Sequence, residues 1–277
     1  MKLGGWFGDR FRLKNRKRRR IVEVNLALCF PEKSEQERQE MCVEHFRVYC
    51  RCLLDSGLAL FSSESRVRKL IKFEGLDNYR QMLADHKVIT IGWHLTTMEF
   101  GNNILGMAGP AVSMMKPMNN PLLTWIFAYG RTRTSDTDLV TRDRGMRPLL
   151  KGLKEGRQCV LFPDEDLAEG GQGSTFVPFF GIERSMVTTP GRLARSSGAK
   201  VVTCATRLDS STGLYHFSFG KPLADAAYET PEAMALAISQ SMESLLSAMP
   251  EQYMWTFRWF KTRPGGEPSP YDSVPQK

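Results

Sequence analysis

Two short clusters of polar residues follow apolar runs and carry side chains that could move protons. His94 and Glu99 lie five positions apart in HLTTME, directly after the run KVITIGW (87–93). Imidazole is a general base near neutral pH, and a carboxylate can orient its ring and stabilise the imidazolium. Residues five apart in one helix face different directions, so we expect His94 on a loop and Glu99 in the first turn of the next helix.

The same motif also has a purely structural interpretation. Thr96 and Glu99 form a T-x-x-E capping box, in which Glu99 caps the helix and His94 is an ordinary loop residue. The motif brings no nucleophile, and the chain contains no G-x-S-x-G elbow. Cys204 ends a predicted strand, where we expect a buried small residue rather than a reactive thiol. The motif alone leaves both interpretations open.

The second cluster is FPDED (162–166), which contributes Asp164 and Asp166, with Glu169 nearby. It also follows an apolar run, and sites in open α/β sheets gather at the carboxyl ends of strands. These carboxylates could hold a divalent metal, as in a metal-dependent transferase. They could instead form a solvated loop or pair with arginines. Spacing does not decide between these hypotheses.

A cationic band lies between the two clusters in the sequence. Arginine matches phosphate with a rigid two-pronged fork, so the band could line a shared cleft for a phosphorylated substrate. A solvated helix face is the alternative for each of its members. They are Lys116, Arg131, Arg133, Arg142, Arg144 and Arg147.

The elements that must position these residues alternate between helices and strands. Ser34 and Glu37 form an S-x-x-E capping signal, which predicts a helix from there to about residue 61. Strands are predicted at 87–93, 111–115, 158–162, 175–180, 200–208 and 215–220, and helices at 121–130, 144–155, 188–197 and 231–247. This alternation predicts an α/β fold with a mixed, largely parallel central sheet flanked by helices.

Composition describes one globular body with a basic start. Of the 277 residues, 42% are hydrophobic and 25% are charged, and the spacing of the six cysteines fits free thiols rather than a metal site. No signal peptide and no run of 18 apolar residues is present. We expect three segments: a basic, aromatic, membrane-proximal segment (1–30), the catalytic domain (31–264) and a flexible tail (265–277).

The net charge of +8 lies entirely in residues 1–20, which contain nine Lys/Arg and one acid, Asp9. Such a cluster fits a nucleic-acid arm, a solvated tail or a patch on an anionic membrane. Trp6, Phe7 and Phe11 are interspersed with it and favour the membrane interpretation.

Taken together, these segments resemble a known family. HLTTME has the H-x4-D/E form of glycerolipid and lysophospholipid acyltransferases, and the chain more specifically resembles the late acyltransferases of lipid A biosynthesis, the lauroyl/myristoyl transferases of Gram-negative bacteria. The segments in family order are RRRIVEVNLALCFPEKSEQER (18–38), HLTTMEFGNN, KPMNNPLLTWIFAYGR (116–131), LFPDED, FVPFFG (176–181), TTPGRLARSSGA (188–199) and PEQYMWTFRWFKTRP (250–264).

The resemblance implies a glycerolipid acyltransferase-like fold, an acyl-acyl-carrier-protein donor and a phosphorylated glycolipid acceptor, the lipid A precursor. His94 would deprotonate a hydroxyl on an acyl chain of the acceptor, and Glu99 would hold His94 in place. Arg142 is expected to meet substrate phosphate or a site carboxylate. Asp164 and Asp166 match the family's P-D-x-D block, and Lys116 and Arg131 complete the expected substrate-binding set.

No metal, no cofactor and no nucleic-acid partner are expected. The resemblance places the enzyme on the cytoplasmic face of the cell inner membrane, peripheral or anchored. The family usually carries an apolar anchor before the basic run, whereas this chain opens with MKLGGWFGDR. Either the start was assigned too late, or attachment depends on the basic aromatic segment and on apolar surface near the site.

Three alternatives remain at this point. One is an acyltransferase acting on another glycolipid or a lysophospholipid. Another is a metal-dependent transferase that uses FPDED, and the third is a membrane- or nucleic-acid-binding module that works through residues 10–20. The acyl length, the acceptor hydroxyl, the order of action and the oligomeric state are not determined by the sequence.

Overall fold

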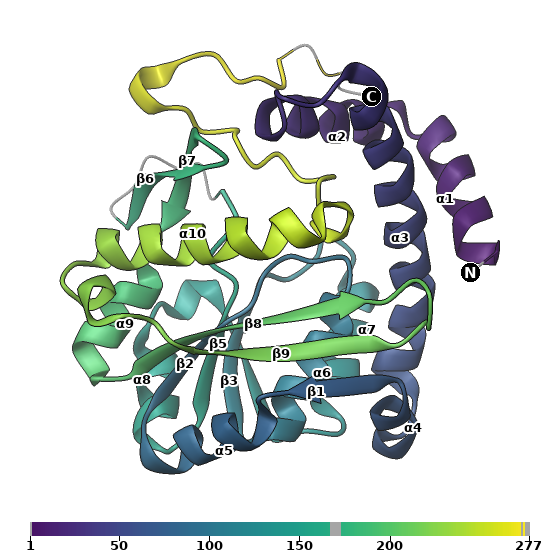
Figure 1. Cartoon of the computed structure of the whole chain (residues 1–277). Coiled ribbons are helices and arrows are strands. Elements are labelled where there is room, and N and C mark those ends of the chain that lie inside the picture. Colours follow the sequence, from purple (N-terminus) through teal and green to yellow (C-terminus); the bar gives the residue numbers. More distant parts are fainter. Residues whose placement is uncertain (1, 167–172, 273, 275–277) are drawn as a thin grey trace.

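The computed structural model describes residues 2–166, 173–272 and 274 of the chain. It shows a central sheet flanked by helices (Figure 1), so the predicted α/β fold is confirmed. Within the described residues, seven strands form the main sheet in the order β1-β9-β8-β2-β5-β3-β4. Neighbouring strands are parallel except for β8 and β9, which are antiparallel. The sheet is therefore mixed and largely parallel, as predicted.

The strands mostly coincide with the predicted apolar runs. The main sheet contains β1 (Ile71–Glu74), β2 (Val88–Ile91), β3 (Ala111–Met115), β4 (Thr137–Thr141), β5 (Gln158–Leu161), β8 (Lys200–Leu208) and β9 (Tyr215–Pro222). A separate antiparallel hairpin contains β6 (Ser174–Phe179) and β7 (Ile182–Val187). The strands β1, β4 and β7 have no predicted counterpart. The strands β1 and β4 lie at the edges of the main sheet, where a continuous apolar run is not required.

The helices surround the sheet and its carboxyl edge. They are α1 (Lys2–Lys14), α2 (Arg16–Cys29), α3 (Glu35–Phe61), α4 (Glu64–Lys69), α5 (Leu76–Asp85), α6 (Met98–Ala108), α7 (Pro121–Thr132), α8 (Arg147–Lys154), α9 (Thr189–Ser197) and α10 (Pro231–Ala248). Short 3-10 turns are η1 (Arg142–Arg144), η2 (Asp225–Tyr228), η3 (Pro250–Gln252) and η4 (Pro264–Gly266). The predicted capping box is confirmed at α3, where Ser34 and Glu37 bond each other's backbone.

Described segments near both ends of the chain pack on the body. From the basic segment, α2 contributes Ile21, Val22 and Leu26 to the main hydrophobic core. From the segment expected to be a flexible tail, Tyr271 is buried, and its hydroxyl donates to Asn25 of α2. Tyr271 of this segment is therefore packed on the body, while the three predicted segments and their boundaries remain a prediction. Among the described helices, none combines the length and apolar character needed to cross a bilayer.

Candidate active site

Strand register explains how the two sequence clusters meet. The strands β2 and β5 are parallel neighbours, with Ile91 beside Leu161. His94 and Asp164 each lie three residues beyond these paired residues, so both emerge at the same edge of the sheet. Lys116 directly follows β3 and Arg142 directly follows β4, and these strands are the next ones along the sheet.

Asp164 holds His94 at two points. Its Oδ1 accepts a hydrogen bond from the ring Nδ1 at 2.7 Å, and its Oδ2 accepts one from the His94 backbone N–H at 3.0 Å. The carboxylate is almost fully buried, with 1% of its surface exposed. Because Nδ1 donates to the carboxylate, Nε2 is the ring nitrogen left to accept a proton.

Burial and charge oppose each other in this pair. Burial acts to lower the pKa of His94, but the Asp164 carboxylate, helped by Glu165, raises that pKa above its ordinary value. Burial acts to raise the pKa of Asp164, but His94 and Arg184 lower it. The carboxylate is therefore ionised at neutral pH, and it stabilises the imidazolium that forms when His94 takes a proton.

Glu99 has a different partner from the one expected. Both of its oxygens accept from Arg131, at 3.0 Å from Nε and 2.6 Å from Nη2, and no hydrogen bond joins Glu99 to the His94 ring. The expectation that Glu99 orients the ring is corrected, since Asp164 occupies Nδ1. The structure positions Arg131 with Glu99 and positions His94 with Asp164.

The capping interpretation of HLTTME is also wrong. Helix α6 begins at Met98 with Thr97 as its N-cap residue, and no side chain caps it. The Thr97 hydroxyl donates instead to the Thr206 carbonyl of β8 at 2.6 Å. The Thr97 hydroxyl therefore bonds to a neighbouring strand and does not cap α6.

The FPDED carboxylates point to separate partners. Asp164 binds His94, Glu165 forms an ion pair with Arg142, and Asp166 accepts from the Thr262 backbone N–H at 2.7 Å. In the described ranges, no group of three or more His, Cys, Asp or Glu side chains is arranged to hold a metal ion. Glu169 lies outside the described residues. Arg142 meets a site carboxylate, which was one of its two expected partners.

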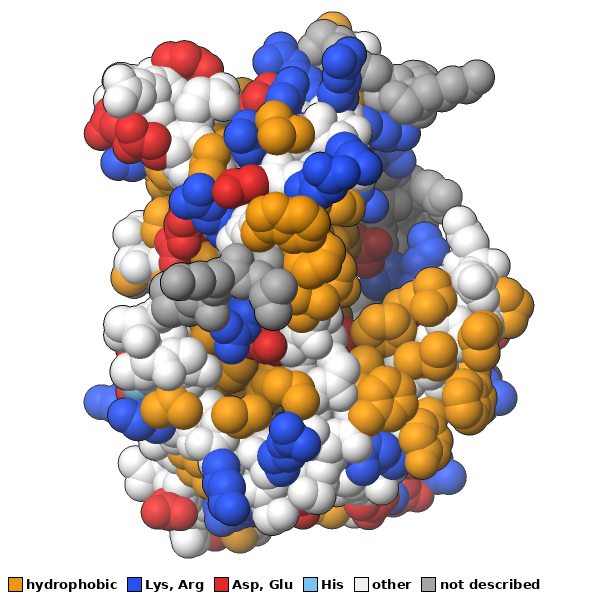
Figure 2. Space-filling view, turned by 90° about the vertical axis from the view of Figure 1, so that its right-hand side faces the viewer, with side chains coloured by type: hydrophobic (Ala, Val, Ile, Leu, Met, Phe, Trp, Pro, Cys, Tyr) orange, Lys and Arg blue, Asp and Glu red, His pale blue; other side chains and the backbone are white. Residues whose placement is uncertain are grey.

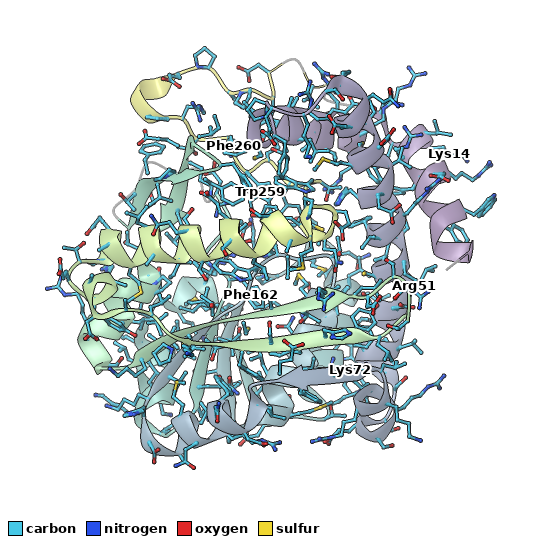
Figure 3. All side chains as sticks on the ribbon, in the orientation of Figure 1. Lys14, Arg51, Lys72, Phe162, Trp259 and Phe260 are labelled. Carbon is cyan, nitrogen blue, oxygen red and sulfur yellow. The ribbon has the colours of Figure 1, made fainter. Side chains whose placement is uncertain are left out.

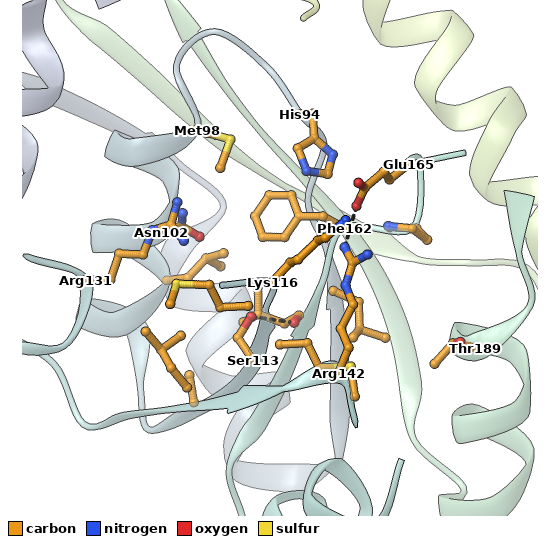
Figure 4. Close-up of a pocket in the computed structure, with 18 of the residues that line it drawn as sticks. His94, Met98, Asn102, Ser113, Lys116, Arg131, Arg142, Phe162, Glu165 and Thr189 are labelled. Carbon is orange, nitrogen blue, oxygen red and sulfur yellow. Dashed lines mark hydrogen bonds and ion pairs between the residues drawn. The ribbon is translucent and has the colours of Figure 1, made fainter. Parts of the chain in front are cut away.

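A cavity of about 490 Å³ opens beside the His94 ring (Figure 4). This volume lies in the usual range for a small-molecule pocket, about 300–1,000 Å³. Much of the wall is apolar and includes Met98, Leu105, Met114, Leu139, Val160 and Leu161. Lys116, Arg131 and Arg142 line the same cavity, so the structure brings them together with His94. Among the described residues Lys116 has no carboxylate partner.

The remaining members of the cationic band do not line this cavity. Arg133 donates to the backbone carbonyls of Leu60 and Ser62 at the end of α3. Arg144 and Arg147 are exposed at the surface. Cys204 is buried, as predicted, and burial raises the pKa of its thiol to about 12.

Sequence reasoning missed the C-terminal segment that covers the histidine. Leu95 and Tyr253 form an isolated antiparallel bridge, and the Met254 N–H donates to the His94 carbonyl at 3.0 Å. Phe257 and Trp259 place their rings 5.6 and 6.0 Å from the His94 ring. Side chains fill the space near α10 where Trp259 and Phe260 lie (Figure 3). The aromatic density of YMWTFRWF was the only signal for this role.

Comparison with known proteins identifies the family of the chain. Residues 1–262 match the family model described as bacterial lipid A biosynthesis acyltransferase. The chain is similar to an Escherichia coli (strain K12) lipid A biosynthesis palmitoleoyltransferase, with 36% identity over 97% of this chain and 87% of the relative. It is also similar to the lauroyltransferase of that strain, with 34% identity over 92% of this chain and 83% of the relative.

The resemblance extends to a third enzyme type. The lipid A biosynthesis myristoyltransferase of Escherichia coli (strain K12) is 26% identical over 98% of this chain and 82% of the relative. The family model covers most of the chain, and the relatives are named for transfer of fatty acyl groups. The chain is therefore an acyltransferase that belongs to the bacterial lipid A biosynthesis acyltransferase family.

Proposed function

We propose that the protein transfers a fatty acyl chain from an acyl-acyl-carrier-protein to a hydroxyl group of a lipid A precursor. The observation that carries the proposal is the His94–Asp164 pair at the wall of a largely apolar cavity. Such a cavity suits an alkyl chain, because burying methylene groups is favourable by about 0.8 kcal/mol each. Relatives named for lauroyl, palmitoleoyl and myristoyl transfer support this choice of substrate.

His94 acts as the general base. Its Nε2 takes the proton of the acceptor hydroxyl while the oxygen attacks the thioester carbonyl and forms a C–O bond. The tetrahedral intermediate then collapses, the C–S bond breaks, and the thiolate leaves with the proton that His94 returns. Asp164 holds the ring and stabilises its charged form between the two transfers.

The cations of the cavity bind the negative charges of the substrate. Lys116 has no carboxylate partner in the described structure, so its ammonium is available for a phosphate group of the acceptor. Glu99 accepts two hydrogen bonds from Arg131 and so fixes the guanidinium at the wall of the cavity. Glu99 then serves the reaction through Arg131 and not through the histidine.

The test uses the purified protein with acyl-acyl-carrier-protein and an under-acylated lipid A precursor. We expect the acceptor to gain the mass of one acyl group. His94→Ala abolishes this transfer, while the matched change at the exposed His86 leaves it intact. Mass spectrometry of lipids from cells with and without the gene identifies the acceptor: a change confined to another glycolipid or a lysophospholipid contradicts the proposal.

We place the enzyme at the cytoplasmic face of the inner membrane, with helix α7 against the lipid. Leu122 and Trp125 of α7 are each 61% exposed, and Trp125 stacks on the exposed Tyr129. Other exposed apolar side chains lie on α3 and α1, namely Leu53, Leu54, Phe61, Trp6 and Phe7. Figure 2 shows hydrophobic side chains gathered on this face with Lys and Arg side chains among them, a combination that suits an anionic lipid surface.

The position of α7 connects this surface to the cavity. Met118 precedes the helix and Arg131 lies in its last turn, and both line the cavity. We expect Trp125→Ser to weaken binding to phosphatidylethanolamine/phosphatidylglycerol vesicles roughly tenfold, because interfacial burial of the ring is lost. The control is Phe176→Ser, at an exposed aromatic of β6. Equal losses in both variants, or none in Trp125→Ser, contradict the placement.

A further inference from the structure

Arg184 of β7 is a charged side chain in an unusual position. It is fully buried, with 0% of its surface exposed, and no carboxylate of the described residues lies within ion-pair distance. Its guanidinium carbon lies 4.0 Å from the Phe179 ring centroid and 5.9 Å from that of Trp259. Buried charges are normally paired, because moving an unpaired ion out of water costs several kcal/mol. This cost is on the order of the whole stability of a domain. Because Arg184 has no directly paired carboxylate, the negative charge that stabilises it must act through an intermediate side chain.

Tyr253 links Arg184 to the carboxylate that holds His94. Arg184 Nη1 donates to the Tyr253 hydroxyl at 3.2 Å, and this hydroxyl donates to Asp164 Oδ2 at 3.3 Å. A tyrosine hydroxyl has one proton, so it accepts from the guanidinium and donates to the carboxylate. The four side chains form one row that ends at the His94 ring, in the order Arg184, Tyr253, Asp164, His94.

Packing fixes the middle of the row. The Tyr253 ring stacks on Trp259 with a centroid distance of 4.6 Å and meets Trp255 edge-on at 4.9 Å. Its backbone is bridged to Leu95, next to His94. The hydroxyl therefore cannot turn away from Asp164 without disturbing several buried rings.

Other ionisable groups near the row are few. Glu165 and Arg142 act on His94 and are paired with each other at the cavity wall. On the other side, Cys29 of α2 interacts with Arg184, and Glu243 of α10 interacts with Cys29. Burial raises the pKa of Cys29 strongly, so its thiol stays neutral. Asp164 is then the acid joined to Arg184 by hydrogen bonds.

We propose that Arg184 and Tyr253 are positioning residues for acyl transfer, which keep the Asp164 carboxylate ionised and fixed against His94. Neither touches the cavity, so they act through Asp164. This inference rests on the proposed role of His94 as the general base. It adds that a charge behind the carboxylate sets the pH range in which the base works.

The test compares Arg184→Met, Arg184→Lys and Tyr253→Phe with the wild type. Removing the positive charge favours proton binding by the Asp164–His94 pair, so the acid limb of the pH profile of kcat/KM moves to higher pH in Arg184→Met, by about one unit. Arg184→Lys keeps the charge and restores the limb. Tyr253→Phe moves the limb in the same direction by less and lowers kcat roughly tenfold with little change in KM.

The matched control is Tyr215→Phe. The Tyr215 hydroxyl also donates to a buried carboxylate, Asp55, at 2.8 Å, and this pair lies away from the cavity. Tyr215→Phe should lower thermal stability without moving the acid limb. If Tyr253→Phe behaves like this control, Tyr253 is merely structural and the proposal is overturned.

A second readout does not depend on activity. The chain has four histidines, so the His94 ring signal can be assigned by NMR from its loss in His94→Gln. The His94 titration should move to higher pH in Arg184→Met and in Tyr253→Phe. An unmoved titration overturns the inference, whereas a moved titration in a protein without acyl transfer overturns the proposed function alone. If Arg184→Met fails to fold, Tyr253→Phe decides.

Discussion

The pairing of His94 with Asp164 rather than Glu99 leads to a sharp comparison between Asp164→Asn and Glu99→Gln. In Asp164→Asn the imidazolium loses a carboxylate that contacts Nδ1 at 2.7 Å. With charge centres about 4 Å apart and an effective dielectric constant of about 20, that attraction is about 4 kcal/mol. Since about 1.4 kcal/mol corresponds to tenfold in rate, we expect kcat/KM to fall roughly a thousandfold.

The pH profile separates the two carboxylates more clearly than the rate does. Burial lowers the pKa of His94, and in Asp164→Asn the carboxylate that opposes this effect is gone. The pKa of His94 therefore falls, and the acid limb of the kcat/KM profile moves to lower pH. Glu99→Gln weakens the grip on Arg131 and lowers activity, but the limb stays in place because Glu99 does not contact the ring. The assay is acyl transfer across pH, with product measured by mass spectrometry.

Two controls keep this comparison interpretable. Asp77→Asn makes the same chemical change at an exposed residue of α5 and should leave both rate and profile unchanged. Asp164→Asn also removes the carboxylate that is linked to Arg184 through the Tyr253 hydroxyl and so destabilises the folded protein, which is why rates must be normalised to folded protein. A limb that moves in Glu99→Gln and stays fixed in Asp164→Asn would refute the assignment of the two carboxylates.

Three further outcomes follow from the structure. Burial lowers the pKa of His45 to about 4 in the folded protein, so the free energy of unfolding should fall by roughly 3 kcal/mol as pH drops from about 6.5 to 4. Chemical denaturation should show a smaller decrease of this free energy over the same pH range in His45→Gln. Arg131→Met leaves Glu99 buried and unpaired, which should cost about 3–5 kcal/mol and lower Tm by differential scanning calorimetry, whereas Arg68→Met on the exposed surface of α4 should not. All six cysteines are buried, so a thiol reagent should label them slowly in the native protein and leave transfer intact; rapid labelling with loss of activity would contradict this.

Local patterns predicted the elements well. The capping signal at Ser34 and Glu37 predicted where α3 begins, and the apolar run 111–115 coincides with β3, because short-range bonding and burial determine both. The same capping logic failed at Thr96, where a carbonyl of β8 competes for the neighbouring Thr97 hydroxyl. A sequence pattern cannot register such a competitor, since it lies more than a hundred positions away.

The candidate site was predicted in content but not in pairing. His94, Glu99, Asp164 and Arg131 were all predicted, yet the partners are exchanged relative to the expectation. The pairing depends on β2 and β5 being neighbours, which is a property of strand order and not of spacing along the chain. Arg184 carried no signal at all, because its neighbours in the sequence form an ordinary hairpin strand.

The cover over His94 has a consequence for the order in which the chain is made. The Thr96 N–H donates to the Gln252 carbonyl, and Asn25 of α2 donates to the Trp255 and Phe257 carbonyls. During translation the histidine loop emerges from the ribosome more than 150 residues before the segment that immobilises it. In a nascent chain, the strands of the sheet can therefore pair before the catalytic loop is held in place. The chain gains acyl transfer activity only once it is synthesised in full, and truncated products should have no transfer activity.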